Sequence, residues 1–177
     1  MTQSNGEPGG TINAVRKRPT AGFQANVSAE AGSWDHYRSM ADISSSLNEA
    51  QTLRGRRVVV VSRSNSFKDS VGDDVNMLYG ILEADVTPDT KLTFGGLYQD
   101  SEATPDFYGL PTGPKGEDLD FDRDTTFIAD WQKRIVRKRN LFAEPEHYFN
   151  EDWRITSKIS YTRIATDTKV GLSLIHI

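Results

Sequence analysis

The 177-residue sequence contains no cysteine and no long apolar run. Without cysteine, neither a disulfide nor a thiolate metal site can form in this chain. The longest apolar run is Val58 to Val61, whereas a membrane-spanning helix needs about 18 or more such residues. A helical membrane span is therefore excluded for this sequence. A transmembrane β-barrel is not, because barrel strands carry a much weaker hydropathy signal.

The sequence also has little apolar content overall. Hydrophobic residues make up 36% and charged residues 26% of the chain, which is low and high, respectively, for a soluble packed core. An aromatic content of 10% argues against a disordered chain. The formal net charge of −4 suggests no nucleic-acid partner. Residues 1–20 have no apolar segment of the kind that signal peptides contain, so an exported protein would have to begin upstream of them.

Catalytic and metal-binding patterns are absent as well. The histidines His36, His147 and His176 are scattered, and no nucleophile-elbow motif occurs. An alternating acidic run in residues 118–124 lacks the glycine and the terminal glutamate of a calcium-binding loop. The acids of that run are Asp118, Asp120, Asp122 and Asp124. We therefore expect no enzyme, no protein-bound metal and no cofactor.

What the sequence does contain is alternation of apolar and polar residues with period two. In residues 23–32, Phe23 and Val27 fall on one face and Gln24 on the other, and the pattern runs without a break. Such alternation predicts β-strands with one apolar and one polar face. No segment has a competing helical period. The predicted strands cover residues 23–32, 35–47, 55–63, 74–86, 91–100, 138–149 and 153–163.

The links between the predicted strands differ in length. Those near 49–53, 87–90 and 150–152 are short, whereas two on the opposite side, 64–73 and 101–137, are longer. Short turns at one end and long loops at the other are typical of transmembrane barrels. Aromatic residues near predicted strand ends fit the interfacial girdles of such barrels. These are Trp34, Tyr37, Tyr148 and Trp153. A soluble β-sandwich with one wet face is the alternative.

The most specific string is Gly-Glu-Pro-Gly-Gly-Thr-Ile-Asn-Ala-Val-Arg-Lys-Arg-Pro-Thr, residues 6–20. It resembles the end of the plug domain in TonB-dependent ferric-siderophore receptors, where a short Val-x-Lys-x-Pro strand follows a glycine-rich segment. The motif residues are Gly6, Pro8, Gly9, Gly10, Asn13, Lys17 and Pro19. Further segments resemble hairpins and loops of the same family in the same order. These lie at residues 32–38, 47–56, 83–90, 108–112 and 142–153.

The resemblance implies an all-β fold, a partial antiparallel transmembrane β-barrel of about seven meander strands preceded by the end of a plug domain. Residues 1–20 would be the C-terminal end of the plug, and 21–170 the N-terminal barrel strands. Residues 171–177 would be a truncated or artefactual tail. Complete receptors of this kind have about 22 strands around a plugged lumen. We therefore expect a fragment that does not transport by itself.

The resemblance also implies a function. Such a receptor lies in the cell outer membrane, binds a ferric siderophore outside, and is driven by TonB through a box that this chain lacks. The iron stays chelated by the siderophore, so no cofactor is needed. The candidate ligand-binding residues are Phe107, Tyr108, Arg123 and Trp131. Alternatives are TonB-dependent uptake of another ligand, such as a cobalamin or a glycan, and a soluble β-rich binding module.

Two features depart from the resemblance. Pro145 stands inside a predicted strand, where proline is disfavoured away from an edge or a bulge. Residues 133–139, Lys-Arg-Ile-Val-Arg-Lys-Arg, form an unusually basic run. This run would meet anionic lipid headgroups, lipopolysaccharide or an anionic ligand, or it would be a solvated extracellular charge run.

Overall fold

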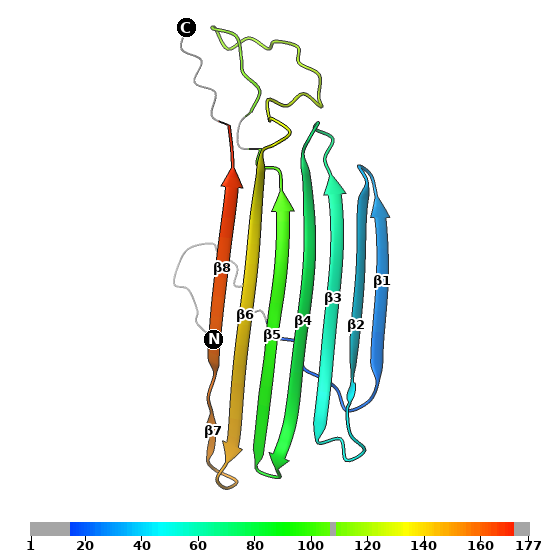
Figure 1. The fold of residues 1–177 in the computed structure, drawn as a ribbon, viewed down its shortest axis with the longest axis vertical. Coiled ribbons are helices and arrows are strands. Elements are labelled where there is room, and N and C mark those ends of the chain that lie inside the picture. Colours follow the sequence, from blue (N-terminus) through cyan, green and yellow to red (C-terminus); the bar gives the residue numbers. More distant parts are fainter. Residues whose placement is uncertain (1–14, 107–108, 172–177) are drawn as a thin grey trace.

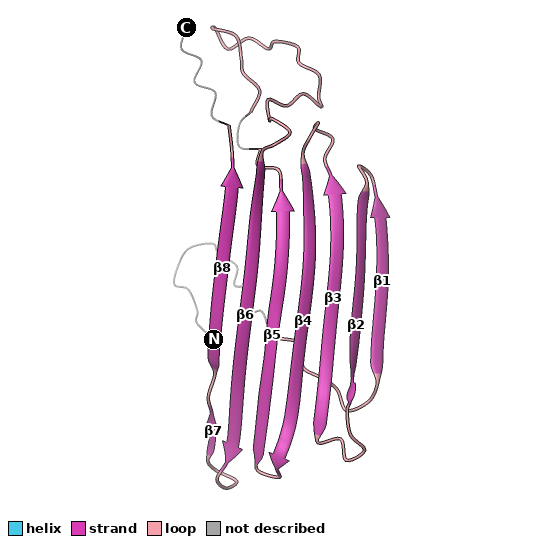
Figure 2. Cartoon of the chain, in the orientation of Figure 1, coloured by secondary structure: helices cyan, strands magenta, loops and turns pink. Residues whose placement is uncertain are grey.

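The computed structural model describes residues 15–106 and 109–171, and these form a single antiparallel meander of eight strands (Figure 1). Between the strands lie only turns and loops, and the described residues contain no helix long and apolar enough to cross a membrane (Figure 2). The strands are β1 (Gln24–Gly32), β2 (His36–Ser46), β3 (Leu53–Asn65), β4 (Gly72–Thr87), β5 (Thr90–Ala103), β6 (Lys133–Tyr148), β7 (Arg154–Thr156) and β8 (Ile159–Lys169). The predicted all-β meander is confirmed.

The strand register shows which side chains share a face of the sheet. Paired residues lie on the same face of a sheet, and the register joins Ile43 of β2 to Arg57 of β3 and Val59 of β3 to Leu78 of β4. The valine run in β3, which blurs the sequence alternation, is thereby divided. Val58 and Val60 are buried on the inner face, and Val59 and Val61 lie on the outer face.

The outer face is a continuous apolar band across the sheet. Large hydrophobic side chains are exposed on it from β1 to β8, namely Val27, Ile43, Leu53, Val61, Leu78, Leu82, Phe94, Leu141, Ile159 and Tyr161. A soluble monomer rarely exposes so large an apolar surface. An apolar-out, polar-in sheet is the arrangement of a barrel wall in lipid, and the soluble sandwich is therefore the weaker interpretation.

The inner face is not uniformly polar. Buried side chains from β3, β4 and β6 form a small apolar cluster there, with Met40, Met77 and Leu97 packed against it. The cluster consists of Val58, Val60, Tyr79, Ile81 and Phe142. The alternation in the sequence does not predict this cluster. It assigns each residue of a strand to a face, but it does not show which residues of different strands pack together on that face.

The predicted strand 153–163 is wrong as a single element. It is split into β7 and β8, with a break at Ser157 and Lys158. Pro145 of β6 lies opposite the break, and its carbonyl accepts a hydrogen bond from the backbone N–H of Ser157 at 3.0 Å. Proline has no N–H to return the second bond of that pair. The pairing of β6 with β7 and β8 is thus interrupted at Pro145, the residue that the sequence analysis identifies as disfavoured in a strand.

Two predicted links are also wrong in extent. The basic run 133–139 does not belong to the loop, because β6 already begins at Lys133 and pairs with β5 and β8. The link between β3 and β4 covers only residues 66–71 and is no longer than the β2–β3 link at 47–52. The asymmetry between the two ends therefore rests on one loop, 104–132, at the upper end in Figure 1.

Both outer strands of the described sheet have a free edge. β1 pairs only with β2, and β8 only with β6. In lipid, unpaired backbone N–H and C=O groups cost several kcal/mol each. We therefore expect the isolated chain to aggregate rather than to insert into reconstituted bilayers. Protection of β2 to β6 from added protease, together with heat-modifiable gel mobility, would contradict this expectation.

Candidate functional site

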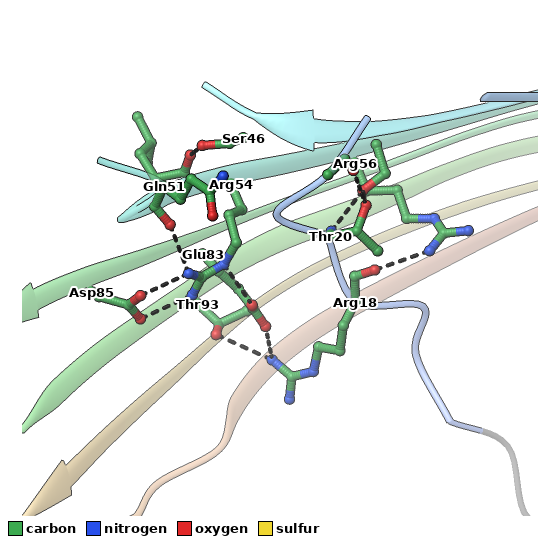
Figure 3. A network of polar contacts seen from close by, with 12 residues as sticks. Arg18, Thr20, Ser46, Gln51, Arg54, Arg56, Glu83, Asp85 and Thr93 are labelled. Carbon is green, nitrogen blue, oxygen red and sulfur yellow. Dashed lines mark hydrogen bonds and ion pairs between the residues drawn. The ribbon is translucent and has the colours of Figure 1, made fainter. Parts of the chain in front are cut away.

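Residues 15–20 lie across the inner face of the sheet and contact five strands. The predicted short strand at Val15 to Pro19 is wrong, because these residues make no ladder with any strand. They are held instead by side-chain contacts, several of which are drawn in Figure 3. We call this stretch, residues 15–20, the inner segment.

Arg18 is the centre of these contacts. Its guanidinium donates to Glu83 Oε1 of β4 at 3.0 Å, to Thr93 Oγ1 of β5 at 3.1 Å, and also to Glu144 of β6. Glu83 and Glu144 are both buried, with exposed fractions of 7% and 5%. Burial acts to lower the pKa of Arg18, but the hydrogen bonds and charges of Glu144 and Glu83 outweigh it and raise that pKa. Arg18 therefore remains a cation that joins three strands.

Asp42 of β2 is the second buried carboxylate that the inner segment meets. Lys17 Nζ lies 2.7 Å from Asp42 Oδ2, and Arg56 of β3 binds both carboxylate oxygens at 2.7 Å. A forked arginine–carboxylate pair of this kind is both stronger and more directional than a single hydrogen bond. Arg56 also donates to the backbone carbonyl of Arg18 at 3.0 Å, so it binds the inner segment directly as well as Asp42.

The backbone of the inner segment is fixed by further contacts. The Tyr79 hydroxyl donates to the carbonyl of Lys17 at 2.9 Å, and the N–H of Thr20 donates to Ser44 Oγ at 2.8 Å. Pro19 is buried between these points. Arg16 Cζ lies 4.1 Å from the ring centre of Phe142. These contacts attach the inner segment to the sheet along most of its length.

A separate ion pair strengthens the sheet near its tight-turn end. Arg54 of β3 donates to both carboxylate oxygens of Asp85 at 2.7 and 2.9 Å and to the carbonyl of Gln51 at 2.8 Å. Figure 3 shows this pair beside the contact between Arg18 and Glu83. Charged side chains on this face thus connect neighbouring strands as well as the inner segment.

At the opposite end, the loop 104–132 packs onto the link 66–71. Lys68 Nζ lies 2.6 Å from Asp106 Oδ2, and Ser70 donates to Asp130 at 2.6 Å. The guanidinium of Arg123 lies 4.8 Å from the ring centre of Phe67, a cation–π geometry. The described parts of the loop, 104–106 and 109–132, are therefore held against the link 66–71.

Of the four predicted ligand residues, the structure describes Arg123 and Trp131, and these two make different contacts. Phe107 and Tyr108 lie outside the described residues. Arg123 contacts Phe67, whereas Trp131 is exposed and approaches Gly171. The Arg123 and Phe67 pair adjoins Trp34, whose ring meets Phe67 edge-on at 6.3 Å.

Trp34 and Phe67 pack with Arg123, although the sequence analysis names Trp34 only as an aromatic near a strand end and does not name Phe67. Trp34 has a φ of +56°, which is uncommon for a residue other than glycine and marks a constrained turn. Nothing in the alternation pattern signals it.

Of the plug-end motif, Gly6, Pro8, Gly9, Gly10 and Asn13 lie outside the described residues. Lys17 and Pro19 are the two motif residues that the structure places, and both contact the wall. No group of three histidine, aspartate or glutamate side chains in 15–106 and 109–171 is arranged to hold a metal ion. The acidic run includes Asp124, whose carbonyl accepts a backbone bond from Asp69 at 3.0 Å.

Replacing Arg18 tests whether the inner segment is held by charge. Arg18→Gln leaves Glu83 and Glu144 buried without their shared cation, at a cost of about 1–3 kcal/mol. We expect backbone amides of residues 15–22 to exchange with deuterium at least about fivefold faster, which corresponds to ~1 kcal/mol. The host for this test is a closed barrel that contains this chain as part of its wall.

The control is Arg38→Gln, which removes an exposed ion pair with Glu30 at 3.9 Å. Exposed pairs contribute little, so exchange should be unchanged. Equal exchange in the Arg18 variant and in the parent would contradict charge anchoring.

The comparisons with known proteins agree with this geometry. No family model matches the chain. It is 35% identical over 167 residues to the ferric-pyoverdine M114 receptor of a Pseudomonas species, and 38% identical over 151 residues to the ferripyoverdine receptor of Pseudomonas aeruginosa. These matches cover 94% and 84% of the chain but only 20% and 18% of the relatives. The chain thus spans about a fifth of their length.

Solved structures give the same result. The outer-membrane ferripyoverdine receptor of Pseudomonas aeruginosa, bound to ferripyoverdine, matches with a TM-score of 0.81 and 33% identity over 88% of the chain and 21% of the receptor. The ferric-catecholate receptor Fiu of Escherichia coli matches at 18% identity with a TM-score of 0.77, which shows a shared fold alone. The relatives are receptors of the outer membrane, so the expectation of a non-enzymatic protein is confirmed. The chain is homologous to a segment of the TonB-dependent ferric-siderophore receptors and belongs to their family.

Proposed function

We propose that this chain forms part of the wall of an outer-membrane receptor that takes up ferric siderophores. The observation that carries the proposal is the inner segment, which crosses the polar face of a sheet whose other face is an apolar band. Such an arrangement suits a barrel whose lumen holds the preceding part of the chain. Residues 1–20 are then the end of a plug, and 21–170 the first strands of the barrel.

The substrate class follows from the relatives. Those named above are receptors for ferric pyoverdines. The iron arrives chelated, so the wall has to recognise the siderophore and needs no metal ligands or cofactor of its own. TonB would act through a box that this sequence does not contain, and lipid would cover the apolar band.

Ligand contacts are assigned to the loop over the upper end of the sheet. Phe107, Tyr108, Arg123 and Trp131 offer the aromatic and cationic groups that grip a planar anionic ligand. Arg123 is already stacked on Phe67, so its first effect is to hold the loop over the lumen. The exposed ring of Trp131 is available for direct contact.

A second candidate is uptake of another chelated metal. The chain is 38% identical over 166 residues to the metal-pseudopaline receptor of Pseudomonas aeruginosa. That match covers 85% of the chain and 21% of the relative. The two candidates share a fold and an energy source and differ only in the ligand that the loops admit.

A chimeric receptor tests the proposal without depending on the isolated chain. Residues 15–171 replace the matching segment of the Pseudomonas aeruginosa ferripyoverdine receptor, so that the remaining strands close the barrel. In a receptor-deficient strain, we expect the chimera to restore uptake of radiolabelled iron from ferripyoverdine in a TonB-dependent way. Correctly folded chimera that binds neither ferripyoverdine nor metal-pseudopaline would contradict the proposal. Selective uptake from metal-pseudopaline would favour the second candidate.

Arg123→Ala in the same chimera should weaken ferripyoverdine binding. The variant removes the cation–π contact between Arg123 and Phe67, worth ~0.5–2 kcal/mol, that holds the loop over the ligand. Loss of this amount from binding predicts an increase in Kd of about two- to thirtyfold, measured by quenching of siderophore fluorescence. Lys115→Ala changes another exposed cation of the same loop and serves as the control, with no change expected. Equal affinity of the Arg123 variant and the parent would remove Arg123 from the ligand-binding set.

A further inference from the structure

Trp34 lies at the tip of the first hairpin, in a backbone conformation that tryptophan rarely adopts. Its φ is +56°, and the φ of the next residue, Asp35, is +53°. Turns with two successive positive φ values usually contain asparagine, aspartate or glycine. Aspartate is therefore a common residue in such a turn, whereas a bulky side chain such as that of Trp34 is strained there. A strained residue of this kind persists only where its surroundings hold it in place.

The turn is held by the end of β3 and by the link 66–71 that follows it. The ring of Trp34 meets the ring of Phe67 edge-on, with 6.3 Å between the ring centres. The N–H of Asn65, the last residue of β3, donates to the carbonyl of Trp34 at 2.9 Å. The side-chain Nδ2 of Asn65 donates to Asp35 Oδ2 at 3.1 Å. Both residues with positive φ are thus attached to the neighbouring hairpin.

Phe67 also contacts the loop 104–132. The guanidinium carbon of Arg123 lies 4.8 Å from the centre of the Phe67 ring. A backbone hydrogen bond of 3.0 Å joins the carbonyl of Asp124 to the same link. The Phe67 ring therefore connects the tip of the first hairpin to the loop. We call the side chains of Trp34, Phe67 and Arg123 the loop anchor.

The alternative role for Trp34 is that of an interfacial aromatic, which its place near a strand end suggests in the sequence. In the structure Trp34 lies in the turn beyond β1 and β2, at the end of the sheet that carries the loop 104–132 (Figure 1). An interfacial ring contacts lipid headgroups, and that role requires neither Phe67 nor Arg123 beside it. The contacts with the link and, through it, with the loop favour the anchor.

We propose that Trp34 positions the ligand loop: through Phe67 it fixes Arg123 and the neighbouring loop residues before any ligand is bound. A loop that is already held in place does not have to be ordered on binding, so the cost of binding falls. An edge-on aromatic pair changes such an equilibrium by about two- to twelvefold. The proposal rests on the proposed function for the part that this loop takes in ligand binding.

The first measurement uses the chimeric receptor without ligand. We expect Trp34→Ala to raise deuterium exchange of the backbone amides in residues 121–127 by about two- to twelvefold. Trp34→Phe keeps an aromatic ring and should exchange as the parent does. Tyr37→Ala is the control, because it removes a ring of similar exposure, 57% against 54% for Trp34, from β2. It should leave the exchange of these amides unchanged.

The second measurement is a double-mutant cycle for the affinity of the chimera for ferripyoverdine. Trp34→Ala should raise Kd by about two- to twelvefold in the parent. In the Arg123→Ala background it should have no further effect, because Trp34 acts through Arg123. A residue that serves folding alone would lower the yield of folded receptor equally in both backgrounds and leave Kd unchanged. Heat-modifiable gel mobility shows that each variant is folded.

Equal loop exchange in Trp34→Ala and in the parent would overturn the proposal, and so would equal effects of Trp34→Ala and Tyr37→Ala. Additive effects on Kd in the cycle would overturn it as well, because Trp34 would then act by another route than Arg123. Exchange is measured without ligand, so the two proposals fail separately. A chimera that shows the expected exchange but binds no siderophore supports the loop anchor and contradicts the proposed function.

Discussion

Glu144 depends on the inner segment for its charge partners. Both cations that pair with it, Arg16 and Arg18, come from residues that precede the first strand. A buried carboxylate without a partner is strongly destabilising, so β6 is well placed in the wall only when the inner segment lies against it. The same guanidinium of Arg18 reaches Glu83 and Thr93 on the two strands before β6. The Arg18 side chain thus links the position of the inner segment to the pairing of β4, β5 and β6.

The two faces of the sheet suit different surroundings. The outer face presents isoleucine, leucine and phenylalanine side chains that water does not favour and lipid accepts. The inner face combines buried charges with the apolar cluster around Tyr79 and Phe142. Its charged members are satisfied in pairs, and no buried side-chain nitrogen or oxygen of the described residues lacks a hydrogen-bond partner. Charge on this face therefore connects elements and leaves little free for chemistry.

Much of the fold can be predicted from local sequence, whereas the side-chain contacts between distant residues cannot. Alternation at Ile43 and Asp42 assigns each side chain to a face, because the period of a strand is two. Pro145 marks the interruption between β7 and β8, because a missing N–H is a local property. By contrast, the pairing of Arg18 with Glu83 and Glu144 joins residues that are distant in sequence, and only the register of β4, β5 and β6 brings the two carboxylates together. The predicted start of β6 is too late because Lys133 and Arg134 look like loop residues, although the end of the strand accepts both, one on each face.

The central claim, that the inner segment is fixed to the inner face, is tested most directly by a cross-link. Thr20 Oγ1 and Ser44 Oγ lie 2.9 Å apart, within reach of a disulfide between cysteines at these positions, and the chain has no cysteine of its own. In the closed chimera, Thr20→Cys with Ser44→Cys should oxidise spontaneously, with the joined peptides found by mass spectrometry. Thr20→Cys with Ser45→Cys, which moves the second thiol to the outer face, should not. Cross-linking that is equal in both pairs, or absent from the first, would contradict the account.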